Sequence, residues 1–588
     1  MAVDALPIFA YYNRQRFTQF GSGDCANWYG VSAPDTKRGQ ALYPAMGRQH
    51  ITSFGQNKLI FNSEPSRLFK STNYAYVIDG TTVIQVDKYY NEKILGDIPL
   101  GSVVWSAALA VNNLVYVMFT TGQRVYVITE DGSTVTMAQV TDPNMPDNPT
   151  YIASFGNRFA VSSAGTPNFA LTQINLGGVF NPADAFTPAT GPLVARASGV
   201  IGQMGVLHNQ LYIFCTYSTD VWSNTPNQLT VGGVTFEFPW KNNTSYNWDF
   251  GIADPESLSI EFDMITLLAQ NAGGLVSFMT SSGQRPVDIS TQAINVLLQN
   301  SRGEPMEMSP FVTGPVYGFT YQYENTIFYR AAAGQYLGYQ QLDIETKANA
   351  IEYNFSTKTW ARVVELNGER NRIQQHTFIN GVHLVTVQDD SALYQMAGNI
   401  YHNELRTPGT LPQDVNAFTK YPMRYILETQ QISLPDYAEF VTNYVQIDFV
   451  FGNKTFYNSM ANFDSTIFIV HEDSTPTCPI FLVAEYETNN EPVFLVMERG
   501  GNPSFSDNHY NALFKPHVEL YYSDDGGETH QSADVREFSP LGAYQWMMRW
   551  NECGTSRNRT YRVICISSAP IVLLGAVHDT ERVSGGAN

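Results

Sequence analysis

The chain has few charged residues and lacks the sequence motifs of common cofactor and catalytic sites. Charged side chains make up 15% of its 588 residues, whereas about a quarter is usual in globular domains. The patterns GxGxxG, P-loop and GxSxG are absent, and the ten histidines show no HxH or HExxH spacing. We therefore predict no catalytic residues, no cofactor and no metal site, and we expect that the protein is not an enzyme.

Cysteine is also scarce, and long apolar runs are missing. The cysteines, an odd number without a CxxC pair, are Cys25, Cys215, Cys478, Cys553 and Cys565. Scattered thiols of this kind are typical of proteins made in a reducing cytosol. The beginning Met-Ala-Val-Asp lacks the basic and apolar regions of a signal peptide, and no apolar run approaches the ~20 residues that span a bilayer. We expect a chain that is soluble when made and inserts into no membrane.

Positive charge is the scarcer sign, since the formal net charge is −20. Stable binding of nucleic acid needs a basic face, so this charge argues against it. The charge does not exclude double-stranded DNA that passes by without sequence-specific binding, because a like-charged wall keeps phosphates from adhering. Residues 461–540 alone hold fourteen acidic and three basic side chains. Residues 1–60 carry a net charge of +3, which fits an arm that touches DNA or an acidic partner, or one that lies over its own sheets.

A short hairpin recurs along the chain. Tight polar turns between apolar flanks occur at Asp79-Gly80, Asn112-Asn113, Gly156-Asn157, His208-Asn209, Gly273-Gly274, Glu324-Asn325 and Asn380-Gly381. After the first interval the spacing is about 45 to 65 residues, the scale of propeller blades. The 34 tyrosines and 35 phenylalanines favour sheet over helix. Because a small hairpin cannot bury its own face, we predict an all-β β-propeller of about six blades, with five or seven as alternatives.

The changes of pattern along the chain predict three segments. Residues 1–70 are expected to form an extended N-terminal arm, and residues 71–425 the propeller. Residues 426–588 are expected to form a β-rich C-terminal region, whose additional antiparallel sheet closes the propeller. An acidic insertion covers about 453–516.

Two stretches inside the propeller segment depart from the strand pattern. A helix is expected near residues 291–300, with Ser290 or Thr291 as its cap. Its apolar stripe consists of Ala293, Ile294, Leu297 and Leu298. The long connection 225–250 contains the aromatic residues Phe236, Phe238, Trp240 and Trp248. Long connections in compact domains are usually functional, and we interpret this one as a contact with a neighbouring subunit.

One local motif, Ser523 to Thr529 (SDDGGET), follows a predicted strand and resembles the Asp-box turn of sialidase-type propellers. We interpret Ser523, Asp525 and Gly527 as a structural turn, because Asp and Gly-Gly make tight hairpin turns and the motif occurs once. Adjacent carboxylates such as Asp389-Asp390 point to opposite faces of a strand, so they cannot flank one sugar bond. The arginines between residues 549 and 562 are expected to pair with acids or backbone carbonyls, with anion binding as the alternative.

Segments spread over nearly the whole chain resemble one family. They are DCANWY (24–29), ISTQAI (289–294), VELYYSDDGG (518–527), MRW (548–550), SRNR (556–559) and Arg562, together with the propeller repeats. They are similar to the tail hub proteins of short-tailed bacteriophages, also called packaged-DNA stabilisation or tail nozzle proteins. The motifs of that family are structural, so the resemblance implies no catalytic residues.

The resemblance implies a structural virion protein. Similar proteins form a homo-oligomeric ring, a hexamer, below the portal-adaptor ring. They extend the DNA channel, retain the packaged genome and allow its ejection. The implied partners are the portal-adaptor ring proteins, the tail spikes or fibres, a needle or plug, and the transiting double-stranded DNA. The implied location is the virion tail, after assembly in the host cytoplasm.

The acidic insertion supplies the candidate site. We predict that its carboxylates line or rim the DNA outlet; the candidates are Asp464, Glu472, Asp473, Glu485, Glu487 and Glu491. Only charges that line the bore would act on DNA, since the Debye length at physiological salt is about 8 Å. Two alternative functions stay open: a receptor-binding or adhesive module, and a propeller glycosidase acting on host surface polysaccharide. The glycosidase would need acids and aromatics clustered at the centre of one propeller face.

Overall fold

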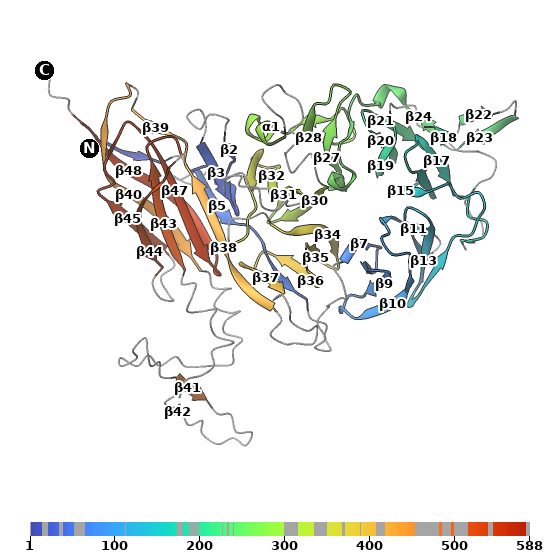
Figure 1. Cartoon of the computed structure of the whole chain (residues 1–588), viewed down its shortest axis with the longest axis horizontal. Coiled ribbons are helices and arrows are strands. Elements are labelled where there is room, and N and C mark those ends of the chain that lie inside the picture. The colour runs from blue at the N-terminus through green and yellow to red at the C-terminus, as the bar shows by residue number, and fades with distance from the viewer. Residues whose placement is uncertain are drawn as a thin grey trace.

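The structure is a computed structural model, and it describes most of the chain. Outside the described residues are 15–21, 34–38, 52–64, 173–179, 187–192, 195–198, 299–314, 334–349, 367–370, 407–417, 453–480, 485–494, 499–515, 539–544 and 584–588, and several gaps of one or two residues. Nearly every regular element in the described part is a β-strand (Figure 1). The prediction of an all-β chain is therefore confirmed.

Seven antiparallel blades follow one another around a ring in the described part of the chain, and blades 6 and 7 are joined into one larger sheet by strands outside the ring (Figure 1). Blades 1 and 2 consist of β7 (Pro65–Lys70), β8 (Ala75–Asp79), β9 (Thr82–Val86) and β10 (Glu92–Asp97), and of β11 (Trp105–Val111), β12 (Leu114–Thr120), β13 (Val125–Asp131) and β14 (Thr134–Gln139). Blades 3 and 4 consist of β15 (Pro149–Phe155), β16 (Arg158–Ser163), β17 (Asn168–Leu171) and β18 (Leu193–Val194), and of β19 (Ile201–Leu207), β20 (Gln210–Cys215), β21 (Thr219–Ser223) and β24 (Lys241–Asn242). The first strand of each blade lies nearest the axis.

The remaining three blades complete the ring. Blade 5 consists of β25 (Gly251–Ile252), β26 (Ser259–Glu261), β27 (Met264–Gln270), β28 (Val276–Ser281) and β29 (Val287–Asp288), with the short 3-10 helix η3 (Pro255–Ser257) between β25 and β26. Blade 6 consists of β30 (Val316–Tyr323), β31 (Thr326–Ala333), β32 (Ala350–Asn354) and β33 (Thr359–Arg362). Blade 7 consists of β34 (Ile373–Ile379), β35 (Val382–Val387), β36 (Leu393–Ala397) and β6 (Gly47–His50).

The described residues thus form seven blades, one more than the approximate number expected. Each of the seven turns recognised in the sequence lies in a different blade, so the turns themselves give the correct count. At Asn380 and Gly381 both φ angles are positive, 51° and 81°, and at Glu324 and Asn325 they are 45° and 63°. Two consecutive positive φ values are the geometry of the type I′ turn, which suits the twist of paired strands.

The N-terminal part of the chain closes the ring. Strand β6 pairs antiparallel with β36, from Tyr394 opposite His50 to Ala397 opposite Gly47. The first and last blades also meet near the axis, where the backbone N–H of Leu68 donates to Gln375 Oε1 over 2.5 Å. The outermost strand of blade 7 therefore comes from a segment more than 300 residues earlier in the chain.

Beside the propeller lies a two-sheet β-sandwich (Figure 1). One sheet contains β4 (Trp28–Ala33), β5 (Gly39–Pro44), β48 (Ile571–Arg582), β40 (Phe440–Phe451) and β45 (Gln545–Asn551), with β1 (Ala2–Ala5) paired to β48 and β46 (Thr555–Ser556) to β40. The other contains β3 (Ser22–Ala26), β38 (Phe418–Glu428), β47 (Asn558–Ser567), β43 (His517–Ser523) and β44 (Gln531–Glu537), with β2 (Asn13–Arg14), β37 (His402–Arg406) and β39 (Ile432–Ser433) at its margins. Trp28 stacks on Tyr425 between the two sheets, with ring centroids 5.3 Å apart.

The sandwich combines strands from both ends of the chain, so the propeller is inserted between them. Strand β3 pairs with β33 of blade 6 at Ala26 and Arg362, and β37 pairs with β6 of blade 7 at Asn403 and Arg48. Buried ion pairs lie at both junctions: Arg362 binds Asp24, and Arg48 Nη1 lies 2.6 Å from Glu365 Oε1. The segment boundaries at residues 70 and 425 stay predictions, although strands cross between all three predicted segments.

The predicted helix is present as α1 (Gln292–Leu298), with Ala293, Ile294 and Leu298 buried. The side chain of Thr291 caps it, since Oγ1 accepts from the backbone N–H of Ile294 over 3.3 Å. Among the described residues, no helix is long and apolar enough to cross a membrane.

The connection 225–250 packs partly against its own propeller. Trp240 and Trp248 are both buried, Trp240 against Phe155 with ring centroids 4.8 Å apart and Trp248 against Tyr212 at 5.2 Å. These two tryptophans therefore do not offer a surface to a neighbouring subunit. The hairpin of β22 (Asn227–Val231) and β23 (Val234–Phe238) extends outward from blade 4 (Figure 1).

Candidate functional site on the propeller axis

The predicted channel-rim acids lie outside the described residues. They are Asp464, Glu472, Asp473, Glu485, Glu487 and Glu491. Their role as a rim of the DNA outlet stays a prediction.

The Asp-box-like segment forms a closed local network. Ser523 Oγ donates to Asp525 Oδ1 over 2.6 Å and accepts from the backbone N–H of Gly527 over 2.9 Å. The backbone N–H of Thr529 donates to the same Asp525 carboxylate at 2.9 and 3.0 Å. These bonds hold the turn between β43 and β44, so the side chains of this segment serve its backbone conformation.

The nearby arginines are paired within the sandwich. Arg559 forms two bonds with the carboxylate of Asp524, at 2.7 and 2.9 Å, and Arg562 Nη2 lies 2.6 Å from Glu428 Oε2. The interpretation that this cluster pairs with acids is confirmed for these two residues. An anion would have to compete with carboxylates already in place.

A cluster of charged and aromatic side chains lies on the propeller axis. Arg67 on β7 in blade 1 donates from Nη1 to both carboxylate oxygens of Glu256, each over 2.6 Å. Glu256 lies in η3 of blade 5. Blades 1 and 5 are not neighbours in the ring, so this ion pair spans the axis. The Arg67 guanidinium also lies 4.1 Å above the ring of Trp105 on β11, a favourable cation–π geometry.

A second carboxylate, that of Asp254, lies beside this ion pair and caps η3. Its two oxygens accept from the backbone N–H groups of Glu256, over 2.8 Å, and Val316, over 3.1 Å. Burial and, to a smaller extent, the charge of Glu256 raise the pKa of Asp254 to about 6, although the two backbone bonds oppose that rise.

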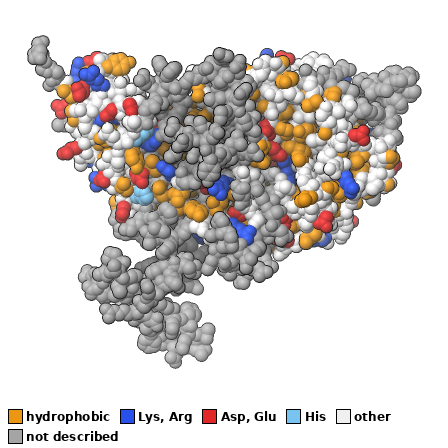
Figure 2. Space-filling model, viewed as in Figure 1, with side chains coloured by type: hydrophobic (Ala, Val, Ile, Leu, Met, Phe, Trp, Pro, Cys, Tyr) orange, Lys and Arg blue, Asp and Glu red, His pale blue; other side chains and the backbone are white. Residues whose placement is uncertain are grey.

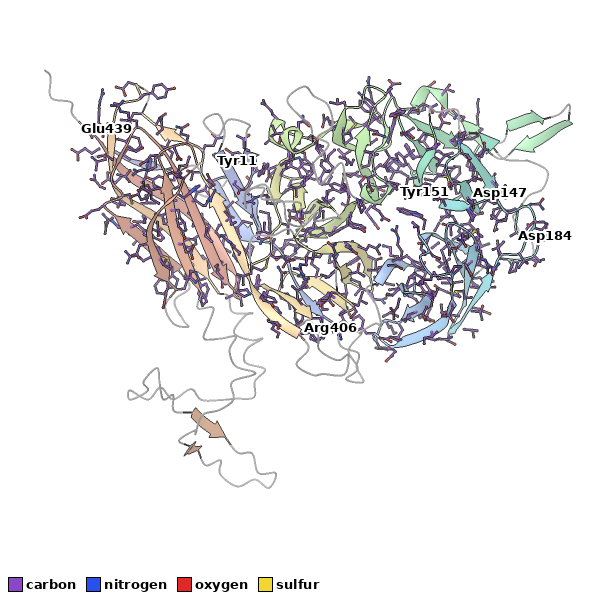
Figure 3. All side chains as sticks on the ribbon, viewed as in Figure 1. Tyr11, Asp147, Tyr151, Asp184, Arg406 and Glu439 are labelled. Atoms are coloured by element: carbon purple, nitrogen blue, oxygen red, sulfur yellow. The ribbon has the colours of Figure 1, made fainter. Side chains whose placement is uncertain are left out.

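Tyr151 on β15 of blade 3 completes the axial cluster (Figure 3). Its ring lies 5.3 Å from that of Trp105. Burial, together with the charges of Asp254 and Glu256, raises the pKa of its hydroxyl to about 12. The axial cluster, defined as Arg67, Trp105, Tyr151, Asp254 and Glu256, thus brings together residues from blades 1, 2, 3 and 5.

A second ion pair, which is more exposed than the first, also crosses the axis. Lys70 Nζ lies 3.4 Å from Glu261 Oε1, and it donates to the carbonyl of Phe378 over 3.2 Å. The major groove of B-DNA alone is about 12 Å wide, whereas the two ion pairs join facing strands through direct contacts. Double-stranded DNA therefore cannot pass along the axis of a single copy.

The axial cluster was not among the residues singled out in the sequence. The one available signal was Asp254-Pro255-Glu256, because Asp followed by Pro is typical of the start of a helical turn. Nothing in the spacing points to Arg67, which is 189 residues away.

The axial cluster places acids and aromatic rings at the centre of the propeller. The carboxylate of Glu256 is bound by Arg67, and the carboxylate of Asp254 accepts hydrogen bonds from backbone N–H groups. Within the described ranges, no group of three or more potential ligand residues could hold a metal ion.

Comparison with known proteins gives one family. Residues 64–309, which contain blades 1 to 5 and α1, match the family model Phage_stabilise, described as "Bacteriophage P22 Gp10, beta-propeller". No curated protein matches the chain.

Solved structures similar to this chain include virginiamycin B lyase from Staphylococcus aureus, with 9% identity over 60% of this chain and 99% of that chain at a TM-score of 0.34. The computationally designed Ika8 protein matches with 12% identity over 59% and 100%, at a TM-score of 0.32. The WD40 domain of Neurospora crassa Pan2 matches with 8% identity over 60% and 95%, at a TM-score of 0.33. At these TM-scores the matches carry no argument about this chain.

Proposed function

We propose, because residues 64–309 match the model of the bacteriophage P22 Gp10 β-propeller family, that this chain is a structural protein of a virion tail that retains packaged DNA. In this proposal, six copies form a ring below the portal-adaptor proteins, and the ring extends the DNA channel. The tail spikes or fibres and a needle or plug attach to it. The family match is the observation that carries the proposal.

The closed axis supports a channel between copies. Ion pairs from Arg67 to Glu256 and from Lys70 to Glu261 cross the axis of one propeller, so DNA has to pass outside that axis. The surface suits close packing of subunits, because charged side chains are scattered among uncharged ones on the face shown in Figure 2. Burying an uncharged polar group costs less free energy than burying an unpaired charge.

Particles that lack this chain test the proposal. A stop codon early in the reading frame should give heads that package DNA but do not hold it, measured as nuclease-sensitive DNA per filled head. Adding purified full-length chain to freshly filled particles should restore retention, and electron microscopy should show an added six-fold ring at the portal vertex. Particles that keep their DNA and infect normally without the chain would contradict the proposal.

The acidic insertion is proposed to rim the outlet of that channel. A variant with Asn or Gln at Asp464, Glu472, Asp473, Glu485, Glu487 and Glu491 removes six charges per copy, and we expect slower ejection with a stronger dependence on salt. A matched control neutralises six acids exposed elsewhere: Asp131, Asp147, Asp249, Asp263, Glu439 and Glu581. Equal ejection rates for the two variants in a single-particle fluorescence assay would exclude a special role for the insertion.

One observation favours a second candidate function, that of a glycan-binding or glycan-cleaving propeller. The axial cluster places aromatic rings and acids at the centre of the propeller, namely Trp105, Tyr151, Asp254 and Glu256. Cleavage would need one carboxylic acid and one free carboxylate beside the bond. Incubation of the full chain with host capsular or lipopolysaccharide glycans, with reducing ends as the readout, distinguishes this candidate. Reducing ends that disappear in a Glu256→Gln variant would support it.

A further inference from the structure

Two imidazoles of blade 7 form a pair on the side of that blade that faces blade 6. His376 on β34 and His383 on β35 are joined by a 2.9 Å contact between His376 Nε2 and His383 Nδ1. Both histidines are partly buried and lie against aromatic neighbours: His376 stacks on Phe319 of β30 with ring centroids 4.8 Å apart, and the ring of His383 is tilted against that of Phe378 at 4.7 Å. The pair therefore forms part of the packing between two blades.

The charged groups that face this pair are cations. Lys70 of β7 and Arg330 of β31 both act on His376 and lower its pKa, after burial, which is the largest cause. The acids on the same side are already committed, because Glu352 binds Arg330 over 2.7 Å and Glu261 binds Lys70 over 3.4 Å.

The other neighbours of the pair are an aromatic ring, a backbone carbonyl and an apolar side chain, which do little to stabilise a second positive charge. On β30, Tyr321 lies edge-on to His383 with ring centroids 6.0 Å apart. The backbone carbonyl of Gln322 accepts from His383 and partly offsets the effect of burial, which lowers the pKa of that imidazole. On β36, the residue opposite His383 is the apolar Met396.

The contact between the two ring nitrogens has room for one proton between them. When both imidazoles are neutral, one ring nitrogen donates and the other accepts. A singly protonated pair can keep the bond, but a doubly protonated pair places two N–H groups opposite each other across 2.9 Å. Two like charges at that distance repel strongly in a partly buried site.

We propose that the His376–His383 pair makes the contact between blades 6 and 7 an acid-sensitive seam, which opens when both imidazoles are protonated. The seam lies beside the blade that closes the ring, while the closing strand β6 is held separately by Glu404, which accepts from the backbone N–H of His50 over 2.9 Å. Mild acid would therefore loosen β34 and β35 against β30 and leave β6 paired.

The direction of the effect follows from proton linkage. A histidine whose pKa is lowered in the folded state binds protons more readily when the seam is open, so the closed form is favoured near neutral pH and loses stability as pH falls below the ordinary histidine pKa of about 6.5. Each proton taken up on opening changes the opening constant by at most tenfold per pH unit, and two protons change it by at most about a hundredfold.

Hydrogen exchange of the full-length chain tests the proposal. Exchange of β34 and β35 peptides is measured by mass spectrometry between pH 7.5 and 4.5 and corrected for the intrinsic pH dependence of amide exchange. In the wild type, the opening constant should rise by more than tenfold per pH unit below pH 6, while β6 peptides stay protected. A constant that does not change with pH in the wild type would overturn the proposal without any variant.

Two substitutions assign the effect to the pair. His383→Asn places an amide where Nδ1 lies, and His376→Gln places one where Nε2 lies, so each preserves a hydrogen bond but removes one titration. In each single variant, the opening constant should change by at most about tenfold per pH unit. In the double variant, the pH dependence of the opening constant that is due to the pair should disappear. A control is His208→Asn, at a half-exposed turn residue with φ 48°, which should leave the seam unchanged. An unaltered dependence in the double variant would refute the assignment.

Discussion

Arg67 and Glu256 form a two-pronged ion pair across the propeller axis, with Arg67 Nη1 2.6 Å from each carboxylate oxygen. Only about a sixth of the Arg67 side chain and a fifth of the Glu256 side chain are exposed. The pair is therefore shielded more than a surface ion pair, and it joins two blades that share no hydrogen-bonded strands.

Removing one partner of this pair should destabilise the propeller. We expect Arg67→Met to lower the free energy of unfolding by about 1 to 3 kcal/mol, because Glu256 is left partly buried without its partner. The measurement is urea unfolding followed by tryptophan fluorescence. Lys70→Met is the matched control: its partner Glu261 is about half exposed, so the change should be below about 1 kcal/mol. Equal effects of the two substitutions would contradict the shielded position of Arg67.

Gly47 is predicted to be required for closure of the ring. A Cβ at this position would lie 2.4 Å from the carbonyl oxygen of His402 and 2.6 Å from that of Ile400. We expect Gly47→Ala to separate β6 from its neighbours, measured as faster amide exchange in β6 and β36. Gly273→Ala is a suitable control, because its nearest contact would be 3.3 Å, to the side chain of Asn271. Undisturbed exchange in β6 would show that the backbone can shift to admit the methyl group.

The buried group Arg330, Glu352 and Tyr321 should be sensitive to the loss of its cation. Arg330 Nη2 lies 2.7 Å from Glu352 Oε2, and the Tyr321 hydroxyl donates to the same oxygen over 2.6 Å. Arg330→Met leaves a buried carboxylate unpaired, and we expect a loss of about 3 to 5 kcal/mol. Adding Glu352→Gln should recover part of that loss, measured by a double-mutant cycle in urea. A double variant as unstable as the sum of the two single variants would exclude the pairing.

Acid should also act on His402, independently of the seam between blades 6 and 7. Burial, and next the charge of Lys420, lower the pKa of His402 to about 4. The unfolded chain binds this proton near pH 6.5, so the folded state loses stability as pH falls from about 6.5 to 4, by on the order of 3 kcal/mol in total. His402→Gln should flatten the urea midpoint over that pH range. A midpoint that depends on pH as it does in the wild type would show that other groups dominate.

The sequence predicts the local units of this fold well. The turn residues have a physical reason to be where they are: Asn157, Asn209 and Asn325 all adopt positive φ, of 59°, 57° and 63°, which Asn tolerates better than most residues. Each such turn marks one blade, so the repeats contain the correct blade number, seven, which is one of the predicted alternatives to about six.

Contacts between distant segments could not be predicted in the same way. Strand β6 is only four residues long, GRQH, and has no alternation of apolar and polar residues that would mark it as a strand. Its place is determined by the backbone of β36. Likewise, the partner of Arg67 depends on how five blades are arranged around the axis, and no local pattern carries that information.

The pairing of the two chain ends has a mechanical consequence. Strand β1 runs antiparallel to β48, with Ala2 opposite Thr580 and Ala5 opposite Val577. Tension applied between the ends would peel these strands apart one hydrogen bond at a time, and it would act on the sandwich before any blade. The inserted propeller would therefore not carry this tension at first, and its blades would stay folded while the strands at the two termini separate.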